Sequence, residues 1–176
     1  EEQKQEFILG GFEGTRRVAF GLTEANHGSD ATHMETRAVR ETRDGVDGWR
    51  IDGEKMWITG MHVATHCAMF ARTAGKAGDA SGITCFLVPN PTEGLKIEEW
   101  MWTFNMPTDH PRLSVTNVWV PDSAILGVEG RGLFAGAMPA RRNAAGRHPR
   151  AQRLPRPDRR RVEPADATAK GGARRA

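Results

Sequence analysis

The pattern of hydrophobic and polar residues along the chain predicts a succession of short strands. Segments rich in β-branched and aromatic residues recur between clusters of Gly, Asp, Asn and Pro, which favour turns. Strands are predicted at residues 18–22, 36–41, 49–51, 54–58, 67–72, 83–88, 95–102 and 113–120. Because no long helical period interrupts this series, the sequence predicts a mainly β fold, built as an antiparallel barrel or sandwich.

One local signal refines this prediction. The dipeptide Asp52-Gly53, with β-forming residues on both sides, predicts a two-residue hairpin turn between the third and fourth strands. Alternation along the strand that follows would place Trp57 and Thr59 on one face and Ile58 on the other.

Composition divides the chain of 176 residues into two unlike parts. Residues 1–133 carry a net charge of −6 and residues 134–176 one of +9, which together give the net charge of +3. Arg, Ala, Pro and Gly dominate the second part, which cannot bury enough apolar surface to offset an ordering cost of about 1–2 kcal/mol per residue. We therefore predict a disordered tail, which is either a basic arm or the product of a shifted reading frame in GC-rich DNA.

Other function classes are excluded by simple counts. No apolar run is long enough to span a membrane, and the first residues lack the features of a signal peptide. The two cysteines, Cys67 and Cys85, are expected to be buried reduced thiols in a cytoplasmic protein. His62 and His66 have the spacing of a metal pair on a helix, but they flank a strand start without a third ligand, so no metal site is predicted.

Two polar segments carry the candidate chemistry. The first strand runs into residues 23–30, which end in Gly-Ser-Asp and suit a phosphate or carbonyl group, although the same residues make ordinary turns. In the second segment, Trp57 beside Thr59 would form one wall of a site for a planar heteroaromatic ligand. The alternative for Trp57 is a core aromatic, which is what most strand tryptophans are.

Taken together, the two segments indicate a protein family far more specifically than either segment does alone. Thr23-Glu24-x-x-x-Gly28-Ser29-Asp30, followed by Gly53-x-Lys55-x-Trp57-Ile58-Thr59, resembles the middle β-barrel domain of the acyl-CoA dehydrogenase family. The resemblance covers about residues 1–133. It implies α,β-dehydrogenation of an acyl-CoA thioester, with FAD taking the β-hydride and an electron-transferring flavoprotein or similar acceptor reoxidising it. It also implies a homo-oligomer in intact family members, and we expect no nucleic-acid partner.

The resemblance assigns a cofactor-binding role to eight residues. These are Phe20, Leu22, Thr23, Gly28, Ser29, Trp57, Ile58 and Thr59. The strand at 20–23 would run along the flavin ring, Trp57 would lie against the isoalloxazine, and residues 58 and 59 would contact it near N5. The Gly-Ser pair would meet the pyrophosphate, and Ser29 would also face the acyl-CoA substrate. The sequence departs from the family at Phe20, where an aromatic hydroxyl is frequent, and at Gly60, where Asn is frequent.

The same resemblance divides the chain into three parts. Residues 1–17 would be the end of an N-terminal helical domain, stopped at Gly10-Gly11, residues 18–133 the flavin-binding β-barrel, and residues 134–176 the tail. No carboxylate can be assigned as the catalytic base, so the chain is expected to be an inactive fragment or frameshifted product. The alternative function is a non-enzymatic β-barrel interaction module whose basic arm binds polyanions.

Overall fold

The structure is a computed structural model that describes residues 2–103 and 105–136. All of these belong to one compact unit, Glu1–Arg141. The predicted tail at 134–176 lies outside the described residues from 137 onward, and its first residues belong to a short helix, α3, which crosses the predicted boundary after residue 133. No helix among the described residues is long and apolar enough to cross a membrane.

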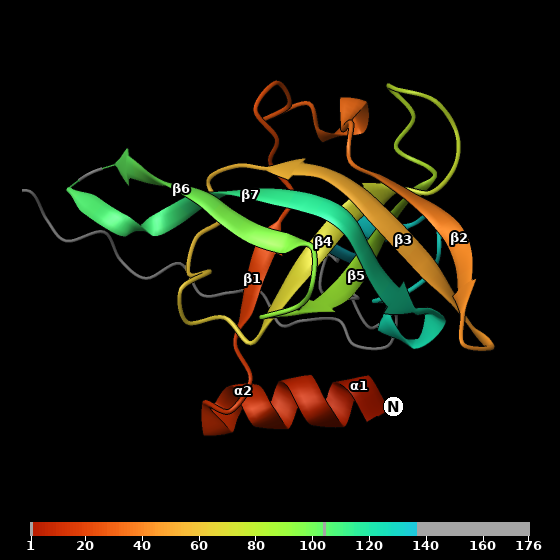
Figure 1. The fold of residues 1–176 in the computed structure, drawn as a ribbon, viewed down its shortest axis with the longest axis horizontal. Helices are drawn as coiled ribbons and strands as arrows, with labels where there is room; N and C mark the ends of the chain where they lie inside the picture. The colour runs from red at the N-terminus through yellow and green to blue at the C-terminus, as the bar shows by residue number, and fades with distance from the viewer. Residues whose placement is uncertain (1, 104, 137–176) are drawn as a thin grey trace, which may run out of the picture. The chain divides into compact units, whose positions relative to one another are not determined.

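Seven strands and a few short helical segments make up the fold (Figure 1). The strands are β1 (Val18–Gly21), β2 (Arg37–Arg43), β3 (Val46–Lys55), β4 (His66–Arg72), β5 (Ile83–Pro89), β6 (Leu95–Thr103) and β7 (Met106–Pro121). The helices are α1 (Glu2–Lys4), α2 (Gly10–Glu13) and α3 (Gly132–Gly136), with a π-helical segment η1 (Gln5–Leu9) and 3-10 turns η2 (Ala31–His33) and η3 (Asp122–Ala124).

The strands form one sheet in the order β1-β4-β2-β3-β7-β6, and β5 pairs with β4. The prediction of a mainly β fold is confirmed. The sheet is mixed rather than antiparallel throughout, because β4 runs parallel to β1 and to the first residue of β2, and it does not close into a barrel. Figure 1 shows the hairpin of β6 and the first part of β7 extending past the ends of the other strands.

The predicted hairpin at Asp52-Gly53 is wrong, because β3 runs straight through it. The turn instead falls at Asp44 and Gly45, whose φ angles of 50° and 79° suit a tight turn between β2 and β3. Gly53 marks an irregularity in the pairing of β3 with β7, and a Cβ there would lie 2.5 Å from the Thr36 hydroxyl. Glycine is therefore required by a close approach of two chain segments.

The N-terminal helical stretch also ends later than predicted. It continues through Gly10 to Glu13 and stops at Gly14, whose φ of 73° is left-handed. Gly10 is buried because the chain returns over it: its carbonyl accepts the Arg16 N–H at 2.9 Å, and a Cβ would meet the Arg16 side chain at 2.6 Å. A packing contact, not a helix stop, accounts for this glycine.

Strands β4 and β5 are buried on both faces. Cys67, Met69 and Ala71 point into the main hydrophobic cluster, while Ala68 and Phe70 between them belong to a second cluster on the other face. This double burial explains why the two strands read as unbroken apolar runs. Both cysteines are buried and unpaired, as predicted, and burial raises the pKa of each thiol to about 12.

A buried ion pair connects the end of β3 to the segment that follows β1. The Nζ of Lys55, which has no exposed surface, lies 2.8 Å from the Oε1 of Glu24 and 3.2 Å from the Leu22 carbonyl oxygen. The Glu24 carboxylate also accepts the backbone N–H groups of Glu35 and Thr36, at the entry to β2. One charged contact thus holds three segments together.

The electrostatics of the pair follow from its burial. Burial alone would raise the pKa of Glu24, but the Lys55 ammonium and the hydrogen bonds from Glu35 and Thr36 outweigh burial and hold this pKa below its ordinary value of 4.5. Burial lowers the pKa of Lys55, and the Glu24 carboxylate opposes that change.

We expect removal of either partner to destabilise the protein severely. Lys55→Met leaves a buried carboxylate without a counter-charge, and Glu24→Gln leaves a buried ammonium, each costing about 3–5 kcal/mol. The exposed pair Arg40–Asp122 is the control, since Arg40→Met should cost much less than either substitution in the buried pair. Urea unfolding measures all three variants, and equal losses in the buried and exposed pairs would contradict this role.

The cost of Glu24→Gln should also depend on pH. A carboxyl whose pKa is lower in the folded state stabilises the protein above its unfolded pKa, and this contribution disappears as the pH falls through the folded pKa. The loss caused by Glu24→Gln is therefore expected to be full at pH 7 and to shrink below about pH 4.5. Unfolding curves of both proteins between pH 7 and 3 measure it, and a constant difference would disprove the ionised pair.

Candidate functional site

The two polar segments singled out in the sequence lie side by side. The Thr23 carbonyl oxygen accepts the Met56 N–H at 2.9 Å, and the Lys55 ammonium reaches the Leu22 carbonyl oxygen from the interior. The segment after β1 therefore runs alongside the segment after β3. We call residues 20–23 together with residues 56–59 the wall.

Trp57 is the most unusual residue of the wall. Its φ of 62° is in the left-handed region, which non-glycine residues rarely adopt, and it is 43% exposed. The prediction that it lies in a strand is wrong, because β3 ends at Lys55. Such strained aromatic residues cluster at functional sites, where the surrounding structure holds them.

The backbone that follows Trp57 is held by β7. The Ile58 N–H donates to the Pro111 carbonyl oxygen at 3.2 Å, and the Gly60 N–H donates to the Asp109 carbonyl oxygen at 3.0 Å. Ile58 is buried in the main core while Thr59 is exposed. Residues 57 and 59 are thus exposed and residue 58 is buried, as expected for a strand. This alternation occurs at a bulge beside β7, beyond the end of β3.

The hydroxyl groups of the wall differ in their surroundings. The Oγ1 of Thr59 lies 3.0 Å from the Nδ1 of His110 on β7. The Thr23 side chain is partly exposed, and its hydroxyl makes no hydrogen bond within the part of the chain that the structure describes. One of the two hydroxyl groups is therefore without a partner among the described residues, and the other contacts a histidine ring.

The β1 side of the wall offers an aromatic ring. Phe20 is 52% exposed, and its ring packs edge-on against Phe70 at 4.9 Å between centroids. Leu22 is partly buried against the second hydrophobic cluster, so the chemistry available at this residue is that of its backbone. Among the described strands, β1 pairs only with β4, which leaves its other edge open.

Gly28 and Ser29 lie in the loop after the wall and are exposed. Two hydrogen bonds between the backbones of Glu24 and His27 close a turn just before them, and the His27 ring lies 3.2 Å from the Glu35 carboxylate. Gly28 has nothing within 4 Å of where a Cβ would stand. No hydrogen bond within the described residues joins this pair to Trp57, so we treat the loop and the wall as separate parts of the candidate site.

Sequence reasoning missed two features that shape the wall. It assigned no partner to Glu24 or to Lys55, and nothing in the polar sequence of β3 indicates that Lys55 is buried. It also assigned no role to His110, whose preceding Asp109 side chain accepts the Gly60 N–H at 3.1 Å. Both features depend on contacts between segments distant in sequence.

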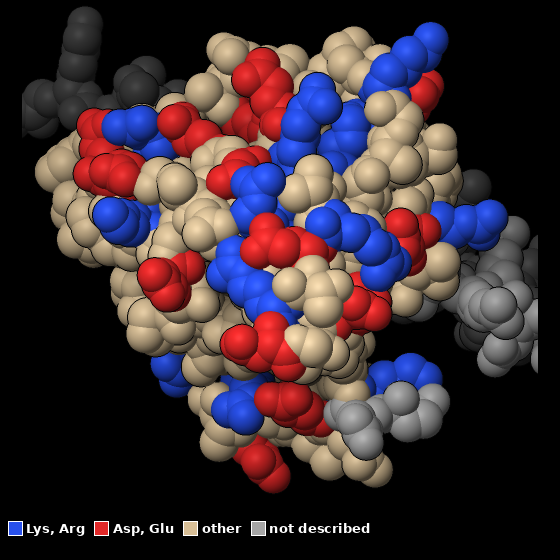
Figure 2. Space-filling model, turned by 45° about the vertical axis from the view of Figure 1, so that its right-hand side comes forward, with Lys and Arg blue, Asp and Glu red and all other residues tan. Residues whose placement is uncertain are grey.

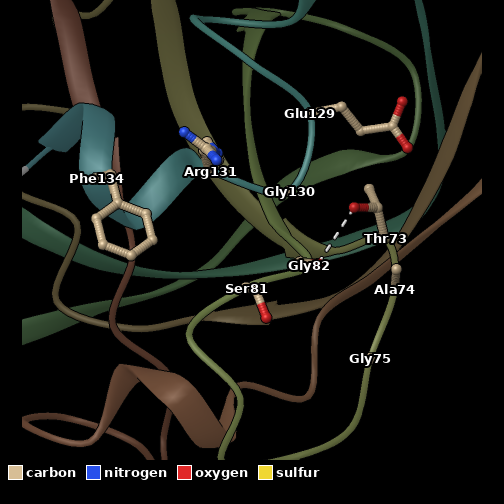
Figure 3. A pocket seen from close by; sticks show the side chains of 9 residues that line it. All are labelled: Thr73, Ala74, Gly75, Ser81, Gly82, Glu129, Gly130, Arg131 and Phe134. Carbon is tan, nitrogen blue, oxygen red and sulfur yellow. Dashed lines mark hydrogen bonds between the residues drawn. The ribbon is translucent and has the colours of Figure 1, made fainter.

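A cavity of about 730 Å³ lies elsewhere, between the β4–β5 loop and the segment that enters α3 (Figure 3). The Thr73 hydroxyl donates to the Gly82 carbonyl oxygen at its base, and Arg131 and Phe134 lie on the α3 side. None of the eight predicted cofactor residues lines it. Size alone therefore does not locate the chemistry that the wall suggests.

Comparison with known proteins assigns most of the described chain to one family. Residues 19–118 match the family model described as the middle domain of acyl-CoA dehydrogenase. The chain is 33% identical over 135 residues to a mitochondrial 2-methylacyl-CoA dehydrogenase of Solanum tuberosum, covering 76% of this chain and 31% of that protein. It is 36% identical over 135 residues to the short-chain specific acyl-CoA dehydrogenase of Megasphaera elsdenii, covering 75% and 34%.

A solved structure of an acyl-CoA dehydrogenase is also similar to the chain. The acyl-CoA dehydrogenase from Geobacillus kaustophilus superposes with a TM-score of 0.68 at 27% identity, over 78% of this chain and 36% of that one. The chain spans about a third of the length of these relatives. The chain therefore belongs to the acyl-CoA dehydrogenase family and contains its middle domain.

Proposed function

We propose that the wall is the FAD-binding surface of an FAD-dependent acyl-CoA dehydrogenase. The observation that carries this proposal is the exposed, left-handed Trp57, which lies two residues before Thr59 and follows Met56, whose N–H donates to the Thr23 carbonyl oxygen. An exposed aromatic plane on a segment with hydroxyl-bearing residues nearby suits a planar heteroaromatic ring with a polar edge.

The described residues fit the cofactor. Trp57 would lie against the isoalloxazine, with Phe20 and the open edge of β1 along the ring. Thr23 and Thr59 would offer hydroxyl groups to its polar edge, and Ile58 its backbone. The exposed Gly28-Ser29 loop would meet the pyrophosphate, and nothing obstructs the space above Gly28. Bound FAD would supply the acceptor for the substrate hydride.

Substrate and partners follow from the same proposal. The relatives are named as dehydrogenases of acyl-CoA thioesters, so we propose an acyl-CoA substrate that contacts Ser29. We also propose an electron-transferring flavoprotein or similar acceptor, and a homo-oligomeric assembly. The predicted division of the chain at residues 17 and 133 belongs to this proposal as well.

The described carboxylates do not supply an obvious catalytic base. Glu24 is adjacent to the wall, but its two oxygens are occupied by Lys55 and by two backbone N–H groups. The depressed pKa of Glu24 further weakens it as a proton acceptor. The wall orients the cofactor without providing the group that removes the α-proton.

The described surface does not favour the alternative of a polyanion-binding module. Figure 2 shows acidic and basic side chains interspersed over the face it presents. Arg40 is paired with Asp122 and Glu129, and Arg50 with Glu41 and Asp52. The proposed basic arm itself lies outside the described residues from 137 onward.

FAD titration tests the wall. We expect FAD to bind the chain and to quench tryptophan fluorescence, and Trp57→Ala to weaken binding by about three- to tenfold, because an aromatic contact is worth about 0.5–1.5 kcal/mol. Trp102→Ala, at another exposed tryptophan on β6, is the control and should leave the affinity unchanged. Equal effects of the two substitutions, or no binding at all, would count against the proposal.

Turnover tests the missing base. With FAD, a saturated acyl-CoA and an artificial electron acceptor, we expect the chain to reduce the acceptor no faster than protein-free FAD does. General-base assistance contributes about 10²- to 10⁴-fold, and Glu24 is not free to provide it. Turnover that Glu24→Gln abolishes, in a variant shown to be folded, would contradict this expectation.

A further inference from the structure

The backbone places Thr59 directly opposite His110. Lys55 pairs with Leu113 where β3 ends, and the two hydrogen bonds from Ile58 and Gly60 to β7 continue the antiparallel pairing after the bulge at Trp57. Between two such bonds, the facing residues form a close pair with neighbouring side chains. The 3.0 Å contact between Thr59 Oγ1 and His110 Nδ1 is that pair.

The carboxylate of Asp109 lies close to Nδ1 of His110. Its Oδ2 lies 3.6 Å from His110 Nδ1, and its Oδ1 accepts the Gly60 N–H at 3.1 Å. His62 lies on the other side, with Nδ1 at 3.5 Å from Oδ1. A carboxylate beside Nδ1 stabilises the proton at that nitrogen rather than at Nε2.

The direction of the hydrogen bond follows. An Nδ1–H donates to a lone pair of the Thr59 oxygen, and a hydroxyl group has only one proton of its own. Because that proton is not used by His110, it is left to point away from β7. In the opposite tautomer, Nδ1 would accept a hydrogen bond from the Thr59 hydroxyl. The hydroxyl could then only accept a hydrogen bond from a ligand.

We propose that His110, held by Asp109, is a positioning residue that turns the Thr59 hydroxyl into a fixed donor toward the ligand on the wall. The idea rests on the proposed function, since it takes the flavin ring as that ligand. A donor fixed before the ligand arrives needs no reorientation when it binds, which is how a protein makes a weak polar contact effective. Exposed Thr23, which has no such partner, lacks this constraint.

The tautomer can be measured without any flavin. The ¹⁵N chemical shifts of the His110 ring in the ligand-free chain distinguish Nδ1–H from Nε2–H. We expect Nδ1–H in the neutral ring, and a change toward Nε2–H in Asp109→Asn. An Nε2–H tautomer in the unaltered chain would overturn the proposal whatever FAD does.

FAD titration then measures the consequence. His110→Ala should weaken FAD binding by about three- to tenfold, the value of one oriented hydrogen bond, and shift the visible absorption of the bound flavin. His110→Asn, which can keep a donor near the Nδ1 position, should restore most of both. His66 provides the control, because its Nδ1 makes the same kind of contact, 3.1 Å from Thr65 Oγ1, outside the wall. His66→Ala should change neither readout.

A double-mutant cycle separates positioning from general structural support. In a Thr59→Val background, His110→Ala should cause no further loss of FAD affinity, because the oriented hydroxyl is already gone. An undiminished loss in that background would overturn the proposal while leaving the FAD wall intact. Failure of the unaltered chain to bind FAD would overturn the proposed function, and His110 would then have no ligand to serve.

Discussion

The contact on which the rest of the wall depends is the buried pair of Lys55 and Glu24. Two opposite charges meet in the interior, and each leaves the other uncompensated if the segments separate. A shift of β3 by one residue would move Lys55 to the other face of the sheet and would leave Glu24 without a partner. The pair therefore favours this register, and it fixes the chain after β1 beside the chain after β3.

The second constraint is strand β7, which continues beside the chain after β3 has ended. Bonds to Pro111 and Asp109 hold the backbone on the C-terminal side of Trp57, while the bond between Met56 and Thr23 holds it on the other side. A left-handed non-glycine residue costs about 1–3 kcal/mol, so it persists only where neighbours fix the backbone. The left-handed backbone at Trp57 is thus fixed by hydrogen bonds on both of its sides.

The sequence predicted the positions of strands well where burial is local. Strands β4 and β5 are apolar on both faces, so their runs are visible without knowing any partner. The order of the strands was not predictable in this way, because the parallel pairing of β1 with β4 joins segments that the local pattern does not relate. The prediction of an antiparallel barrel followed from many short strands without helices between them, a pattern that does not exclude the parallel pairing of β1 with β4.

The errors at glycines have a common cause. Gly53 and Gly10 both occur in sequences typical of a turn or a helix stop, yet each is required by another segment that packs onto it, the distant Thr36 in one case and the nearby Arg16 in the other. Lys55 illustrates the same limit for charge, since a lysine in a sequence indicates a surface residue until Glu24 is placed beside it. Local sequence patterns indicate the propensity for turns, helices and exposed positions. The roles of these three residues depend instead on contacts with other segments.

The candidate site shows the same division between local and tertiary information. Its residue types could be named from two motifs, and the structure brings residues 20–23 and 56–59 together through Thr23 and Met56. What the motifs could not reveal is the direction of each donor, which depends on partners from β7 such as His110. A wall with one ring face and fixed donors would orient a planar ligand, but it would cover only one side of it, and affinity grows with the area that is buried. In the proposed site, orientation and affinity are therefore separable properties, and the described residues would determine the first.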